Sequence, residues 1–305
     1  MSQDDDRTAS LMTPAKLAQL KPKPAVTPAA WLDQLASDAG VLHVRRLAEL
    51  RGQLETQAGS RNPAKAVAAL DGLGEALQEM DFGLLQTSRG WLARATGKAR
   101  TAGAEFGQQY ERAAEAGAAL KEEVQALQAK QQAQASATER TLVEFEVEWH
   151  ALEKILDQGA RWLQDMRNQL KTRQPTDEAG RRQLHEDAAR CELLLVRLKA
   201  LRAVSTAAQQ VHEQARASVT RRASVLQSLQ QLAGSQYKAW QTAVAPLPAG
   251  PANPPAREVE HGSQAHKELR KAAEHAASSC AQLKEQEQAL ASSLSALGEQ
   301  LRAAS

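Results

Sequence analysis

The sequence is poor in aromatic residues and has no long apolar run. Aromatic residues make up 3% of the 305 positions, with two tyrosines and three phenylalanines, and mean hydropathy is −0.50. A large globular core needs bulky side chains, which are scarce here, whereas good helix formers such as alanine, leucine, glutamine and glutamate are abundant. We therefore predict an all-α protein of long helices and coiled coils, not a pair of compact domains.

Cysteine is also scarce, since only Cys191 and Cys280 occur. Two cysteines so far apart argue against a secreted disulfide scaffold, and both fall on predicted apolar seams, where a thiol behaves as a small hydrophobe. No segment approaches the roughly 20 apolar residues that cross a bilayer. The first residues, MSQDDDRTASLM, are acidic and lack the apolar stretch of a signal peptide. We expect a soluble, cytoplasmic protein, with peripheral contact to the inner membrane as an open alternative.

The sequence also lacks an excess of positive or negative charge. Lysine and arginine number 38, aspartate and glutamate 36, and the net charge is +2. The two signs are interspersed, as on solvated helix faces. This balance argues against a dedicated nucleic-acid-binding protein, which normally carries a strong basic excess.

Heptad spacing indicates two long helices, over about 105–172 and 177–245. Pro175 ends the first, and Thr176-Asp177-Glu178 caps the second with acids at the positive end of its dipole. A tight turn between helices of nearly equal length predicts an antiparallel coiled-coil hairpin over 105–245. The seam of the first helix advances in steps of four and three residues, through Phe106, Tyr110, Ala113, Gly117, Leu120, Val124 and Leu127.

The seam becomes polar near the middle of the first long helix. It continues through Gln131, Gln134 and Thr138, and then takes an extra step of four to Leu142. Two successive steps of four form a stutter, which locally relaxes a left-handed supercoil. We predict the bend or weak point of the hairpin here.

Shorter segments flank the hairpin. Residues 1–28 read as a disordered tail, and 29–104 as a small helical region that starts after Pro28. The five prolines of 246–257 predict a stiff, extended linker.

A last heptad helix is expected over 258–305. Its seam carries one charged residue, Glu287, which needs solvent or a basic partner. The helix either folds back on the hairpin or pairs with another chain, in which case the contact would include Leu283, Leu290, Leu294, Leu297 and Leu301.

No motif with catalytic or cofactor chemistry stands out. Thr96-Gly97-Lys98 lacks the glycine five positions earlier that a phosphate-binding loop requires. The pair Glu146 and His150 and the pair His185 and Cys191 each offer two metal ligands, whereas a stable site needs three or four. We expect no catalytic residue, no cofactor and no bound metal.

One segment, 87–100, is basic and free of acids, with a tryptophan at its centre. Three interpretations stay open: packing of the tryptophan against the long helices, contact with an anionic membrane, and contact with nucleic-acid phosphates. The candidate contact residues are Arg89, Trp91, Leu92, Arg94, Lys98 and Arg100.

The order of features over roughly 80–245 resembles the bacterial toxic-anion-resistance (TelA) family, which is associated with tellurite resistance. The segments that carry the resemblance are Phe106–Tyr110, Leu120-Lys121-Glu122-Glu123-Val124, Glu148-Trp149-His150-Ala151-Leu152-Glu153, Arg197-Leu198-Lys199-Ala200-Leu201-Arg202 and Tyr237-Lys238-Ala239-Trp240. The resemblance implies a helical cytosolic protein of toxic-oxyanion or envelope-stress resistance, often found near membranes, and supplies no catalytic residues.

Taken together, these features predict a non-enzymatic helical scaffold or adaptor that acts through protein–protein contacts. Two alternatives stay open. One is a peripheral membrane protein that uses 87–100, and the other is a self-assembling structural coiled coil.

Overall fold

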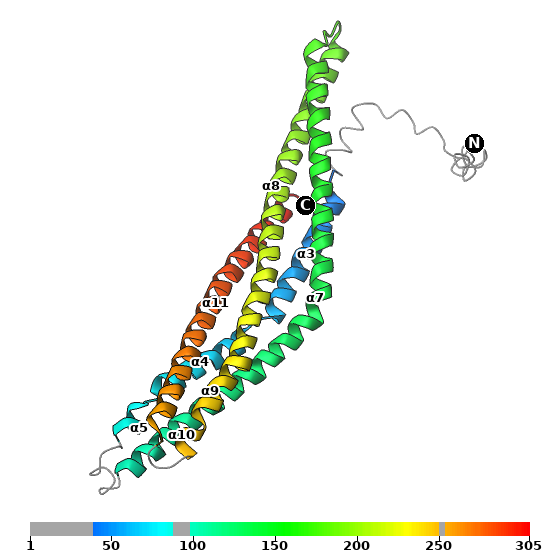
Figure 1. Ribbon diagram of the computed structural model, residues 1–305. Coiled ribbons are helices and arrows are strands. Elements are labelled where there is room, and N and C mark those ends of the chain that lie inside the picture. The colour runs from blue at the N-terminus through cyan, green and yellow to red at the C-terminus, as the bar shows by residue number, and fades with distance from the viewer. Residues whose placement is uncertain (1–38, 88–97, 250–253) are drawn as a thin grey trace, which may run out of the picture. The chain divides into compact units, whose positions relative to one another are not determined.

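In the computed structural model, which describes residues 39–87, 98–249 and 254–305, all regular secondary structure is helical (Figure 1). The prediction of an all-α protein with long helices is confirmed. The elements are α3 (Val41–Ser60), α4 (Ala64–Glu79), α5 (Gly83–Thr87), α7 (Lys98–Thr172), α8 (Glu178–Gln231), the π-helical turn η2 (Leu232–Gln236), α9 (Tyr237–Val244), α10 (Pro246–Ala249) and α11 (Ala256–Ala303).

The described chain divides into two compact units, each assembled from segments far apart in the sequence. Among the described residues, unit 1 takes those of 39–45, 149–206 and 300–305, and unit 2 takes those of 46–148 and 207–299. The residues of each of the helices α3, α7, α8 and α11 are therefore divided between the two units. The sequence predicts boundaries at proline-rich segments, whereas the two compact units are defined by which helices pack together.

Side-chain oxygens accept hydrogen bonds from backbone amides at two helix starts, and the sequence pattern predicts the second of these. The Asn62 Oδ1 accepts a hydrogen bond from the Ala64 amide at 2.9 Å, at the start of α4. The Asp177 Oδ1 accepts one from the Gly180 amide at 2.8 Å, at the start of α8. Both side chains satisfy amides that have no partner within the helix, so the local sequence sets these two boundaries.

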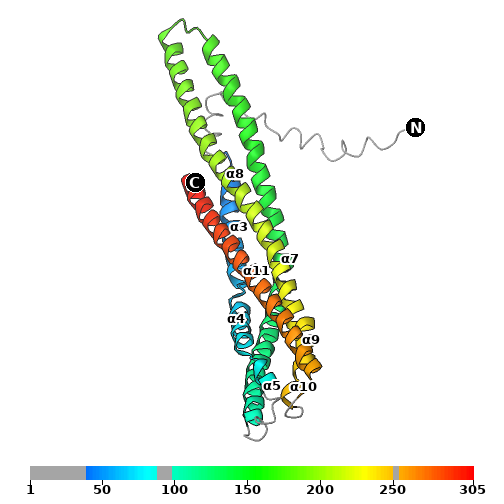
Figure 2. The ribbon, with the colours of Figure 1, turned by 60° about the vertical axis from the view of Figure 1, so that its left-hand side comes forward.

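The core of unit 2 is one apolar cluster shared by α4, α7, α8, α9 and α11. Figure 2 shows α11 beside α8 and α9 in this unit, and Arg221 of α8 donates to Gln282 of α11 at 2.9 Å. Each fully buried leucine stabilises the fold by about 1.5–3 kcal/mol. The cluster includes Leu70, Leu73, Leu77, Phe106, Leu120, Leu229, Trp240, Leu269 and Leu283.

Unit 1 pairs the end of α7 with the start of α8. Arg167 contacts Glu192 at 2.9 Å, and Arg173 contacts Asp187 at 2.8 Å. Later residues of α7 therefore meet earlier residues of α8. The backbone carbonyls of Ala39 and Ala304 both accept hydrogen bonds from Arg197, which attaches the two ends of the described chain to α8.

Gly40 is the one described residue with a positive φ, of 75°. Its absent Cβ would lie 3.0 Å from Leu152 and 3.1 Å from Leu201. Both the backbone conformation and the space therefore require glycine immediately before α3.

The helix predicted to run unbroken to 245 contains a π-helical turn, η2. From α8 into the turn the buried positions advance as Ser218, Arg222, Val225, Leu229 and Leu232, and from the turn into α9 they advance as Ala233, Tyr237, Trp240 and Val244. The later series is the earlier one displaced by one residue. A π turn accommodates one extra residue, so both series stay buried.

The predicted extended linker over 246–257 is corrected at both ends. Residues 246–249 form the helical turn α10, whose Leu247 is 2% exposed, and α11 already begins at Ala256. Proline suits a first helical position because it has no amide to leave unpaired, and burial of Leu247 holds the turn in place. The first long helix likewise begins at Lys98, earlier than the predicted 105.

Several predictions lie outside the described residues. These are the disordered tail over 1–28, the first ten residues of the helical region over 29–104, and most of the basic segment. Within the described ranges, no helix combines the length and the apolar character needed to cross a bilayer.

Substitution of Gly117 tests the packing of α7 against α9. A Cβ at Gly117 would lie 2.6 Å from Cζ of Tyr237 and closer still to Cε2. The ring is held because its hydroxyl donates to the Ala114 carbonyl at 2.8 Å. We expect Gly117→Ala to lower the free energy of unfolding by about 1–3 kcal/mol in urea denaturation.

Gly72→Ala is the matched control. No heavy atom lies within 4 Å of a Cβ placed at Gly72. Alanine there should raise stability by about 0.5–1 kcal/mol, because it favours the helix without a clash. Equal stability changes for the two variants would contradict the close approach.

Candidate partner-binding groove

Unit 1 carries a groove between the end of α7 and the start of α8. It has a volume of about 420 Å³, and among the residues that line it none is acidic. The lining consists of Leu156, Ala160, Leu163, Gln164, Arg167, Asn168 and Lys171 from α7, and of Leu195, Leu198, Lys199 and Arg202 from α8. We call this surface the cationic groove.

The floor of the cationic groove is apolar. Leu156, Leu163 and Leu198 are only 6–7% exposed, so they lie below the rim. Gly159 allows the two helices to approach, since a Cβ there would lie 2.6 Å from Leu198 Cδ2. The floor is therefore recessed and closely packed.

The rim of the groove carries four cations: Arg167, Lys171, Lys199 and Arg202. Arg167 is paired with Glu192 across the helices, at 2.9 Å. Among the described residues, the other three form no ion pair within 4.0 Å. The rim therefore has uncompensated positive charge beside apolar surface.

One acid near the tip of the same helix pair, Asp187, is buried. It is 5% exposed and accepts hydrogen bonds from Arg173, Gln183 and Arg190. These three donors satisfy the carboxylate within the tip, and Asp187 does not line the groove.

Two other surface hollows of the described chain carry charges of both signs. In unit 2, the groove between α3 and α7 carries the cations Arg46 and Arg140 together with the acids Glu49 and Glu144. The groove between α4 and α11 carries one arginine, Arg270, with several acids. Neither of these combines a recessed apolar floor with charge of one sign.

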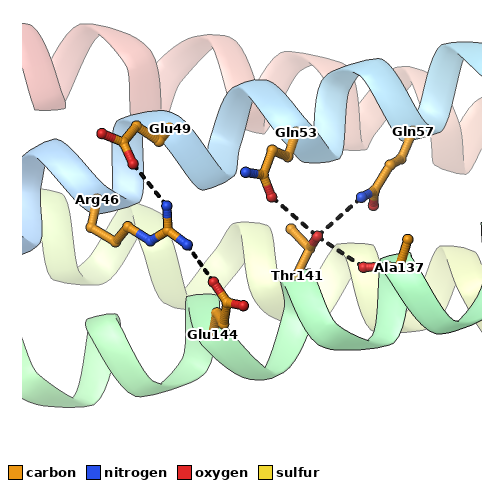
Figure 3. A network of polar contacts seen from close by, with 7 residues as sticks. All are labelled: Arg46, Glu49, Gln53, Gln57, Ala137, Thr141 and Glu144. Carbon is orange, nitrogen blue, oxygen red and sulfur yellow. Dashed lines mark hydrogen bonds and ion pairs between the residues drawn. The ribbon is translucent and has the colours of Figure 1, made fainter.

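Figure 3 shows the polar network that joins α3 to α7 in unit 2. Arg46 donates to Glu49 and Glu144, and these hydrogen bonds raise the pKa of the guanidinium. The Thr141 hydroxyl accepts from Gln57 at 3.0 Å and lies 3.3 Å from Gln53 Oε1. Ser60 of α3 also donates to Gln134 of α7 at 2.7 Å, so polar side chains of α3 contact the polar stretch of the α7 seam.

The same level of unit 2 contains a buried ion pair between α8 and α11. The Arg222 Nε donates to Glu287 at 2.6 Å, and its Nη2 donates to the Ala58 carbonyl at 3.3 Å. Arg222 is 4% exposed, whereas the Glu287 side chain is 23% exposed. We call the set Gln57, Arg61, Thr141, Arg222 and Glu287 the polar layer.

Arg61 brings a second guanidinium into this layer. It is 8% exposed and donates from Nε to the Gln57 carbonyl at 3.0 Å. Burial, and then the nearby charge of Arg222, lower its pKa to about 10. The charged seam position that the sequence singles out, Glu287, therefore faces two arginines.

The two cysteines are buried, and two of the histidines contact glutamates. Cys191 and Cys280 are free thiols, 2% and 5% exposed, and burial raises the pKa of Cys280 to about 11. His150 contacts Glu153 at 2.8 Å, and Glu146 lies 3.6 Å from His212. In the described part of the chain, no three potential metal ligands converge.

The predicted site residues fall into two groups. The seam leucines Leu283, Leu290, Leu294, Leu297 and Leu301 are at most 5% exposed, so the chain itself covers them. Of the basic segment, Lys98 and Arg100 belong to α7, and Arg89, Trp91, Leu92 and Arg94 lie outside the described residues.

Sequence reasoning missed the cationic groove, although a signal was present. Arg167 and Lys171 are four residues apart on α7, and Lys199 and Arg202 three apart on α8. Such spacings place each pair on one helix face. The pattern of a single helix does not show that the cationic faces of α7 and α8 lie on either side of one apolar floor.

No family model, no curated protein and no solved structure matches this chain. The resemblance to the toxic-anion-resistance family stays a prediction.

Loss of Glu287 should destabilise unit 2 strongly. Glu287→Ala leaves Arg222 buried without a carboxylate, and removal of one partner of a buried pair costs about 3–5 kcal/mol. Arg222→Met should cost less, because the partly exposed Glu287 can then be hydrated. Urea unfolding measures both, with the exposed neighbour Glu285→Ala as a control whose effect should stay within about 0.5 kcal/mol. Equal losses of unfolding free energy in Glu285→Ala and Glu287→Ala would contradict the stabilising role of the Arg222–Glu287 ion pair.

Proposed function

We propose that this chain is a non-enzymatic helical scaffold or adaptor that acts through protein–protein contacts. Its frame would be an antiparallel coiled-coil hairpin of α7 and α8, with α11 packed along it. The supporting observation is the cationic groove, where α7 and α8 present an apolar floor and a rim of one charge to the outside. A contact surface of this kind suits binding, since the hollow gives a shaped surface with an apolar floor and the cations give selectivity.

The proposed setting is resistance to toxic anions such as tellurite, or to envelope stress, in the cytoplasm. The resemblance supports this setting through segments that include Arg197–Arg202. Two rim cations, Lys199 and Arg202, belong to that segment. The groove thus lies in the part of the chain on which the resemblance rests.

Deletion of the gene in its host should lower growth in graded concentrations of tellurite. Expression of the unchanged protein should restore tolerance, and Lys199→Glu with Arg202→Glu should not, because the rim loses its positive charge. Lys121→Glu with Lys271→Glu is the matched control, since both lysines are exposed and neither lines the groove. Unchanged tolerance in the deletion strain would exclude a role in tellurite resistance.

Exposed apolar side chains support a second candidate, self-assembly. Val147 of α7 is 61% exposed, and Leu193 and Val196 of α8 are 61% and 64% exposed. Apolar positions three or four residues apart on one helix can pair with a second copy.

Light scattering after size-exclusion chromatography separates the two candidates. The adaptor is expected to elute at the mass of one chain, 33.0 kDa. A concentration-dependent multiple of that mass, lost in Leu193→Glu with Val196→Glu, would favour self-assembly instead.

A further inference from the structure

The cationic groove is open along about four helical turns of α7. Its α7 lining runs from Leu156 to Lys171, which spans about 22 Å at the α-helical rise. The apolar floor residues within it follow helical spacing. A straight segment of similar length is therefore the shape that fills the groove.

A third helix is the element that matches this surface. In unit 2, leucines of the long helices are covered by α4 and α11, and the shared cluster contains Leu70, Leu120 and Leu283. In unit 1, no described segment fills the space above Leu156, Leu163 and Leu198. An amphipathic helix buries its apolar face in such a groove through positions i, i+3, i+4 and i+7.

The rim determines the charge of that helix. Lys171, Lys199 and Arg202 have no carboxylate within ion-pair distance among the described residues, and the lining itself has no acid. Carboxylates on both flanks of a docked helix would reach these cations, whereas lysines there would be repelled. We infer that the cationic groove binds an acidic amphipathic helix of a partner protein.

Two other occupants are outcomes of the test. A flat anionic bilayer meets the rim cations but does not reach leucines that are 6–7% exposed. The chain's own residues 29–38 contain Trp31, Leu35, Asp33 and Asp38 and lie outside the described residues, so a variant of this segment is part of the test.

The inference rests on the proposed adaptor function and names the chemistry of its partner. The test uses the full chain and synthetic labelled peptides, read by fluorescence anisotropy. The probe is a helical peptide with leucines at i, i+3, i+4 and i+7 and glutamates on both flanks. One control peptide replaces each glutamate by lysine, and another scrambles the order so that the leucines no longer share a face.

The acidic amphipathic peptide is expected to bind, and added salt should weaken it. Lys199→Glu with Arg202→Glu should reduce affinity by about tenfold or more, and so should Ala160→Trp, which fills the groove from an exposed position. The charge control Lys121→Glu with Lys271→Glu and the bulk control Ala189→Trp should leave affinity unchanged, since these residues are exposed and outside the groove.

Several outcomes would overturn the inference. Equal binding of the scrambled or lysine peptide would remove the requirement for an acidic amphipathic face. Unchanged affinity in the groove variants would place binding elsewhere. Flotation with vesicles of phosphatidylglycerol that the rim variants abolish, without peptide binding, would identify a membrane contact. Binding that appears only after Trp31→Glu with Leu35→Glu would identify the chain's own segment as the occupant.

The two proposals fail separately. If the peptide binds as expected and tellurite tolerance does not depend on the gene, the helix-binding groove stands and the resistance role does not. If tolerance depends on Lys199 and Arg202 while no peptide binds, the adaptor role stands and its partner is not an acidic helix.

Discussion

Burial of apolar seams is the constraint on which the structure depends. Each long helix carries apolar side chains at steps of three and four residues, and an exposed stripe of that length is unfavourable in water. The solution in unit 2 is mutual: α4, α7, α8, α9 and α11 all contribute to one cluster. In unit 1 the same requirement is met by fewer helices, and the remaining surface is the cationic groove.

The polar layer shows how such seams keep their register. Apolar seams of similar spacing can pair at several offsets, because one leucine replaces another at little cost. A buried arginine with a single carboxylate within reach has one satisfactory offset, in which Arg222 of α8 meets Glu287 of α11. Gln57 of α3 and Thr141 of α7 make a comparable match at the same level. The buried polar residues of each seam thus favour one offset between the paired helices.

Much of the fold follows from periodicity and local capping. The seams through Phe106, Leu120 and Leu152, the end of α7 before Pro175 and the start of α8 at Asp177 are all evident from single-helix patterns. These signals depend on residues within one or two turns of each other, so the sequence contains them directly.

The features that the sequence did not predict depend on contacts between segments far apart in the sequence. The helical turn α10 forms because Leu247 is buried within unit 2. The five prolines of 246–257 predict an extended segment instead. The polar layer needs four separate segments at one level. The groove needs Arg167 and Lys199 on one side of two paired helices. Periodicity shows which face of a helix is buried, but not which other helix covers it.

The π turn η2 has a consequence for how this chain tolerates change. Because it takes up one residue, the seam before Leu232 and the seam after Tyr237 are in different rotational phases. The extra residue keeps both series in one apolar cluster, which contains Leu229 and Leu232 as well as Trp240 and Val244. Deletion of one residue within the turn would leave an uninterrupted α-helix on which the two series still share one face.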